Sequence, residues 1–321
     1  MTKGTPKDKT LFSFDKKAIL TMFKYAPLAL GIIILAVGAL FVPWHDVTPY
    51  FSRLNPLSYL AILVLGVAYY VARIARYHYM LKVLDAPLSF MKTVVAYFTA
   101  QPISLLPAGE AYRVVTLNEH GNVPKSKGVS IVFIQSFTEN IALIVLALIG
   151  AVILNQYVLI IFSVLLLYLT ILILVRARRV AIKSHTLITK VPFINFARTK
   201  LQTFVTRNKL LLSGRSFIVL IISGFISSLI ASLLLFILAN NLGISLDFTH
   251  AMIAFTIPTV LQNITFLPGG IGVNEQGTVG ILLLLGASLP AAVALTLLMR
   301  LVTLGLGVII GLITTVIVKA K

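Results

Sequence analysis

The sequence predicts an all-α polytopic membrane protein, and its composition and hydropathy are the reasons. Apolar residues make up 59% of the 321 residues and charged residues only 11%, whereas soluble domains carry roughly 25% charged residues. The mean hydropathy is +1.01. No cysteine is present, which excludes disulfides, thiolate metal sites and cysteine nucleophiles.

Apolar stretches long enough to cross a bilayer define the expected helices. Six spanning helices are expected, at residues 26–44, 57–72, 129–153, 157–175, 217–239 and 290–318. Residues 1–25 form a basic N-terminal segment, and because no small-residue cleavage site closes the first span cleanly, we expect that span to be retained. The second span is expected to stop at Arg73 and Arg76.

Two further apolar stretches, near 88–113 and 249–286, contain helix-breaking residues. Proline removes a helical hydrogen bond, and glycine permits backbone shapes that other residues avoid. Broken backbone at membrane depth needs protein or trapped water to satisfy it, so both stretches are expected to form re-entrant hairpins. The expected breaks are Pro102, Pro107, Gly109, Pro258, Pro268, Gly269, Gly270 and Gly272.

The distribution of basic residues predicts cytoplasmic N- and C-termini. If both termini, segments 73–92 and 107–128, and the linker 176–216 face the cytoplasm, only Arg53 and Arg300 of the 27 Lys and Arg residues lie elsewhere. This distribution follows the positive-inside rule. It requires the first hairpin to return to the cytoplasmic side and the second to return to the outside.

The resulting order predicts an inverted repeat, with a first transmembrane unit at 26–153 and a second at 154–318. Each unit has two spans, a hairpin and a third span, which is an architecture found in many transporters. Packing alone is the other explanation for paired breaks. The linker contains no Asp or Glu, and either a surface helix or a solvated basic loop there would be attracted to the anionic inner leaflet. Nucleic acid is not needed to explain its charge.

Ionisable residues within the apolar segments are the candidate site, because burying them in a bilayer is costly. One hypothesis is a central charged cavity for a lipid headgroup, in which arginines attract phosphate and carboxylates balance charge or hold a cationic group. The alternatives are a buried ion pair that only locks two helices, and a helix-capping role for Glu275. The candidate headgroup residues are Arg300, Glu139, Glu110, Arg113, Glu275, Gln262 and Asn263.

Several of these residues fall in motifs that resemble the flippase-like transmembrane family named for the lysylphosphatidylglycerol synthase/flippase. The second half carries Pro-Gly-Gly-Ile-Gly-Val-x-Glu at 268–275 and Leu-Leu-Met-Arg-Leu at 297–301. The first half carries Pro-Ala-Gly-Glu-x-x-Arg at 107–113, similar to the family's PxGExxR element. The sequence departs from the family at Gln135 and Ser136, where members often carry Glu-Arg.

The resemblance implies a module that moves or accommodates a polar, anionic or zwitterionic lipid. The aminoacyltransferase domain of the bifunctional relatives is not expected, because the sequence ends three residues after the last span. We therefore expect a lipid translocase or lipid-binding transporter in the cytoplasmic membrane of a bacterium or archaeon. An accessory scaffold for a cell-envelope transferase and a membrane-embedded transferase are the alternatives.

Catalysis and cofactors are not expected. The sequence has no HExxH motif, no paired Asp motif and no phosphate-binding loop ending in Lys-Ser/Thr. The histidines lack metal-ligand spacing; they are His45, His78, His120, His185 and His250. We therefore predict no metal, no cofactor and no catalytic residue, with membrane lipids as the partners.

Overall fold

The computed structural model describes residues 40, 44–86, 88–105, 109–155, 210–265 and 270–319. The regular structure in these ranges is entirely helical, which confirms the all-α prediction. Four helices there are long and apolar enough to cross a membrane: α3 (Pro56–Val83), α6 (Lys125–Leu154), α10 (Gly214–Asn241) and the run Leu289–Val318. The basic segment 1–25, nearly all of the expected span 26–44, the expected span 157–175 and most of the linker lie outside the described residues.

The prediction that the second span stops at Arg73 is wrong. Helix α3 continues for 28 residues to Val83 and contains both Arg73 and Arg76. It begins where the side chain of Asn55 accepts a hydrogen bond from the Ser58 backbone N–H at 2.8 Å, an N-cap arrangement. The two arginines are part of a helix long enough to span and do not mark its end.

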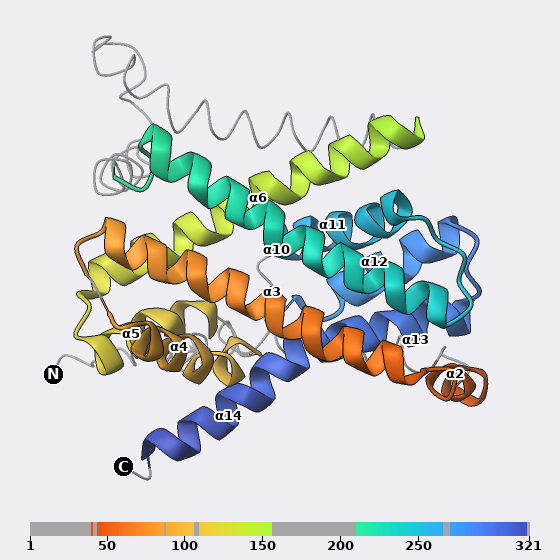
Figure 1. Ribbon diagram of the computed structural model, residues 1–321, viewed down its shortest axis with the longest axis horizontal. Coiled ribbons are helices and arrows are strands. Elements are labelled where there is room, and N and C mark those ends of the chain that lie inside the picture. Colours follow the sequence, from red (N-terminus) through yellow and green to blue (C-terminus); the bar gives the residue numbers. More distant parts are fainter. Residues whose placement is uncertain are drawn as a thin grey trace, which may run out of the picture.

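Helices α3 and α10 lie antiparallel at the centre of the protein (Figure 1). The start of α3 meets the end of α10, where the Asn55 amide donates to Asn241 at 3.2 Å. At their opposite ends, Tyr79 donates to Ser216 at 3.4 Å. These two contacts fix the direction of both helices.

Each of the two broken stretches folds as a pair of packed helices. The first contains α4 (Phe90–Thr99) and α5 (Tyr112–Gly121), separated by short 3₁₀ turns at Pro102–Leu105 and Gly109–Ala111. The second contains α11 (Phe248–Thr265) and α12 (Val273–Leu284). Pro107, Pro268 and Gly269 lie outside the described residues.

The expected break at Pro258 is wrong, since α11 runs through that residue. The breaks at Gly109 and Gly270 do require glycine. A Cβ on Gly109 would lie 1.9 Å from the Ile103 carbonyl oxygen, and one on Gly270 would lie 1.9 Å from the Gln262 side chain. Gly270 and Gly272 also have positive φ, 65° and 89°, which side chains disfavour.

Gly270→Ala is therefore expected to destabilise the second hairpin. The added methyl group combines backbone strain with a clash against Gln262, and such strain costs on the order of 1–3 kcal/mol. Thermal unfolding of the purified protein measures the loss. Gly280→Ala in α12 is the matched control, because no described atom outside its own helix backbone lies within 4 Å of its added Cβ and alanine favours helix. An unchanged Tm for Gly270→Ala would contradict this account of the turn.

Each hairpin packs reciprocally on the last described helix of the other half of the chain. Helix α4 of the first hairpin packs on α14 (Leu306–Lys319), the last described helix of the chain, while α11 of the second packs on α6. The second helix of each pair packs on the helix that follows it, α5 on α6 and α12 on α13 (Leu289–Arg300). The short helix α2 (Trp44–Phe51) lies against α13.

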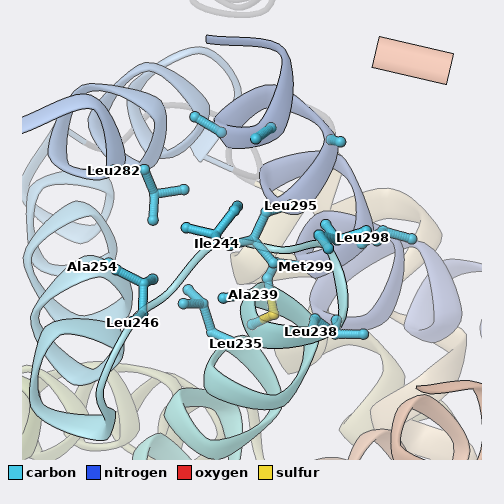
Figure 2. Packing of buried hydrophobic residues seen from close by; sticks show 14 of the residues in the cluster. Leu235, Leu238, Ala239, Ile244, Leu246, Ala254, Leu282, Leu295, Leu298 and Met299 are labelled. Carbon is cyan, nitrogen blue, oxygen red and sulfur yellow. The ribbon is translucent and has the colours of Figure 1, made fainter. Parts of the chain in front are cut away.

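The described residues form two large apolar cores, one at each hairpin. One joins α10, α11, α12 and α13, and Figure 2 shows side chains of this core converging, among them Leu235, Leu282 and Met299. The other joins α3, α4, α5, α6 and, through Leu220 and Ala231, α10. A π-helix at Leu301–Gly305 separates α13 from α14. Val302 in this π-helix belongs to the first core, and Leu306 at the start of α14 packs against the second core.

Candidate polar site

The candidate residues form two groups, one at each hairpin. We call Arg73, Arg76, Glu110, Arg113 and Glu139 the arginine cluster, because they join α3, α5, α6 and the turn before α5. We call Glu275 and Arg300 the second-half pair, which joins α12 to α13. The sequence placed Arg113 and Arg300 in one cavity, but each is paired with a different carboxylate.

The second-half pair joins one guanidinium to one carboxylate. Arg300 Nε donates to Glu275 Oε1 at 2.6 Å, and both side chains are mostly buried. The other carboxylate oxygen, Oε2, accepts the Gly272 backbone N–H at 2.7 Å at the start of α12. Glu275 thus has both roles that the sequence left open, as ion-pair partner and as helix cap. Arg300 NH1 also lies 3.4 Å from Gln262 Oε1.

Glu139 lies at the centre of the arginine cluster. Its Oε1 accepts a hydrogen bond from Arg73 NH1, and its Oε2 accepts one from Arg76 NH2 at 3.0 Å. The same Arg76 nitrogen donates to the Gln135 carbonyl at 2.8 Å. Because Arg76 is 2% exposed, this charge is buried between helices, where an unpaired ion is costly.

Tyr97 of α4 connects Arg73 to Arg113. Arg73 Nε donates to the Tyr97 hydroxyl at 3.0 Å, while the Arg113 guanidinium lies 4.4 Å from the Tyr97 ring centroid, in the range of a cation–π contact. Arg113 Nε donates to Glu110 Oε2 at 2.7 Å. The Arg113 side chain is 3% exposed and that of Glu110 is 58% exposed, so this pair runs from the surface to the interior.

An amide contact joins the two groups. Asn263 of α11 donates to Asn140 Oδ1 of α6 at 2.8 Å. Asn263 follows Gln262, which contacts Arg300, and Asn140 follows Glu139, which contacts Arg73 and Arg76. Polar residues of the two groups are therefore consecutive in α6 and in α11, and the amide contact links these two helices; we call this series of residues the polar chain.

The sequence prediction missed Arg73, Arg76 and Tyr97. It treated both arginines as loop charges, because each interrupts an apolar stretch. The available signal was their spacing of three residues, which places them on one helix face, within a tyrosine-rich segment at 69–79. Glu139, chosen from the sequence, is the residue on which both converge.

The arginine cluster has more donors and more positive charge than its described neighbours balance. Three guanidinium groups share two carboxylates. Within the described ranges, several buried atoms have no hydrogen-bond partner: Arg76 Nε and NH1, Arg113 NH1, the Tyr77 hydroxyl and Gln135 Oε1. Most of these atoms are donors, so the cluster is suited to an acceptor-rich, negatively charged group.

No group of three or more His, Asp or Glu residues suited to a metal ion occurs among the residues that the structure describes. The side chains that could contact a ligand are instead arginines, amides and tyrosines. These groups recognise oxyanions and polar headgroups by hydrogen bonding and charge.

Long apolar helices and a buried polar chain between two broken hairpins define a multi-pass membrane protein with a polar interior. The sequence model of the lysylphosphatidylglycerol synthase TM region matches residues 28–311. The chain belongs to this family, as its motifs indicated. A comparison with curated proteins gave no match.

Proposed function

We propose that this membrane protein binds a polar lipid headgroup in its interior and moves it across the bilayer, while the acyl chains stay in the lipid. The polar chain between the hairpins carries the proposal. Buried ionisable residues in a membrane are expensive and are most often retained for a substrate or ion path. Membrane lipids surround any protein of this family, so the substrate reaches the site from the bilayer itself.

The proposed topology is an inverted repeat of six spans and two re-entrant hairpins, with both termini in the cytoplasm. The reciprocal packing of the hairpins on α14 and α6 supports it. So does the location of Lys82, Lys125 and Arg215 near one end of the α3–α10 pair, which the positive-inside rule assigns to the cytoplasm. The membrane is then the cytoplasmic membrane of a bacterium or archaeon.

Alternating access in this proposal uses the π-helix as a hinge. The π-helix directly follows Arg300 and separates the contacts of the last span with the two cores. Such π segments occur often at functional sites. The Tyr70 hydroxyl donates to the Thr303 carbonyl within it at 2.9 Å, so α3 holds the hinge in the conformation described.

Tyr70→Phe is expected to raise the rate of lipid movement roughly two- to tenfold, because a hydrogen bond worth about 0.5–1.5 kcal/mol is removed from one conformation. Tyr79→Phe is the control on the same helix, since its hydroxyl contacts Ser216, away from the hinge. Rates in proteoliposomes measure the effect. Equal rates for Tyr70→Phe and wild type would exclude the hydrogen bond as a restraint on the hinge.

The proposed function is tested with fluorescent phospholipids in proteoliposomes and a membrane-impermeant quencher. Wild type is expected to make nearly all of the labelled lipid accessible to the quencher, whereas protein-free vesicles protect about half of it. The paired substitution Asn140→Leu and Asn263→Leu is expected to slow movement at least tenfold by interrupting the polar chain with apolar groups. Wild-type vesicles that remain half-protected for every headgroup tested would contradict translocation.

A non-catalytic scaffold for a cell-envelope lipid or glycan transferase is the second candidate. The ion pair of Arg300 with Glu275 favours the scaffold, because one guanidinium paired with one carboxylate suits a structural contact between two helices. Lipid that copurifies with the protein without any transbilayer movement would support the scaffold. We infer no catalytic role and no cofactor, in keeping with the lack of a catalytic motif in the sequence.

A further inference from the structure

The arginine cluster and the second-half pair differ in charge balance. In the second-half pair, one guanidinium meets one carboxylate. In the arginine cluster, Arg73, Arg76 and Arg113 pair with Glu139 and Glu110 alone among the residues that the structure describes, which leaves one positive charge in excess there when all five groups are ionised. Water can satisfy free donors, but it cannot balance this charge.

Two of the three arginines present unpartnered nitrogens although they are nearly buried. Arg76 and Arg113 are each 2% exposed. Arg76 Nε and NH1 and Arg113 NH1 lack an acceptor among the described residues, as does the hydroxyl of Tyr77, whose ring packs edge-on against Tyr97 at 5.6 Å. A buried charged donor without an acceptor is unfavourable, so a bound acceptor would stabilise the cluster.

We propose that the arginine cluster is a binding site for a phosphate-like anion, and that this site, not Arg300, receives the phosphate of the headgroup. The inference rests on the proposed function for the lipid as the source of the phosphate, but the anion site itself does not depend on transport. Arg73, Arg76 and Arg113 supply charge, Tyr77 supplies a neutral donor, and Glu110, whose side chain is 58% exposed, lies at the side of the cluster nearest the surface. Glu139 holds two of the guanidiniums in place.

The helix opposite Arg76 leaves room for its guanidinium group. Gly224 of α10 faces it, and a Cβ there would lie 3.1 Å from Arg76 NH1 and 3.0 Å from Ala142 Cβ. Gly224→Ala would therefore displace the guanidinium without changing any charge. This substitution tests the position of Arg76 separately from its presence.

The experiment uses the full-length purified protein and inorganic phosphate as the probe. Binding to the native state raises the Tm with ligand concentration, so phosphate is titrated against sodium chloride of equal ionic strength. Wild type is expected to show a saturable rise in Tm. Arg76→Met and Arg113→Gln are expected to weaken the apparent affinity at least tenfold, and Gly224→Ala at least threefold. Arg53→Gln, which removes a charge from the loop before α3, is expected to bind as wild type does.

The Tm without phosphate separates binding from folding. Arg76→Met is expected to fold with a Tm close to that of wild type, because Glu139 keeps Arg73 as a partner and the buried Arg76 nitrogens that lack an acceptor are removed. Equal phosphate responses in wild type, Arg76→Met and Arg113→Gln would overturn the anion site. So would the absence of a saturable response in wild type.

A second arm identifies the source of the anion. If phosphatidylglycerol in the vesicles abolishes the rise in Tm that phosphate causes in wild type, this result would support a lipid phosphate in this site. A phosphate response that persists in those vesicles would overturn that assignment and leave a site for free phosphate. Lipid movement without any phosphate response would reject the anion site while the proposed transport function stands.

Discussion

Glu139→Gln is expected to lower the Tm by roughly 10 °C, through a loss of about 3–5 kcal/mol. The substitution keeps the size of the side chain but removes the negative charge to which Arg73 and Arg76 both donate. Two guanidinium groups would then remain side by side in the interior without their shared carboxylate. Mutual repulsion and desolvation both act against the folded state.

The matched control is Glu119→Gln, because Glu119 is an exposed residue at the end of α5. Removal of an exposed carboxylate changes stability by less than about 1 kcal/mol. Thermal unfolding in detergent measures the Tm of both variants. Size-exclusion chromatography after heating measures the share of each protein that stays in the monodisperse peak. If Glu139→Gln and Glu119→Gln had the same Tm, Glu139 would not be the charge that holds the cluster.

Glu275→Ala is expected to destabilise the second half by about 4–6 kcal/mol. The change leaves Arg300 without its carboxylate partner, at a cost of about 3–5 kcal/mol, and it removes the cap on the Gly272 N–H, at a cost of about 1 kcal/mol. Gln276→Ala is the control, since its side chain is exposed and next to Glu275 in α12.

The double variant Glu275→Ala with Arg300→Met separates the ion pair from the cap. If the buried charge accounts for most of the loss, removal of both partners restores stability to within about 2 kcal/mol of wild type. A double variant as unstable as Glu275→Ala would contradict that division and assign the loss to the cap. Thermal unfolding of wild type, Glu275→Ala, Arg300→Met and the double variant measures the coupling free energy between the two side chains.

The helical membrane fold follows from the sequence because the bilayer limits the possible structures so strongly. An uninterrupted apolar stretch has to be helical to satisfy its own backbone, so α3, α6 and α10 were expected, although each is longer than its apolar core. Gly109 and Gly270 were expected as breaks because glycine permits backbone shapes that other residues avoid, and in the structure a Cβ at either position would clash. Pro258 was not a break, because a proline is tolerated inside a membrane helix when neighbouring packing supports it.

The partners within the site were harder to predict because they depend on which helices meet. Glu139 and Arg300 stand out as charges within apolar runs, and the sequence identified both. Arg73 and Arg76 lie where an apolar run ends, so hydropathy alone assigns them to a loop. Only the packing of α3 against α6 places them on Glu139.

The measurement that tests the central claim most directly is thiol accessibility along α6. The natural chain has no cysteine, so single substitutions report without background. Asn140→Cys lies in the polar chain, whereas Leu143→Cys, three residues away, lies in an apolar cluster with Ile144 and Val260. We expect a charged, membrane-impermeant reagent to modify Asn140→Cys in intact proteoliposomes and to leave Leu143→Cys unmodified. If neither cysteine reacted, or both reacted equally, the polar chain would not be a path open to a headgroup.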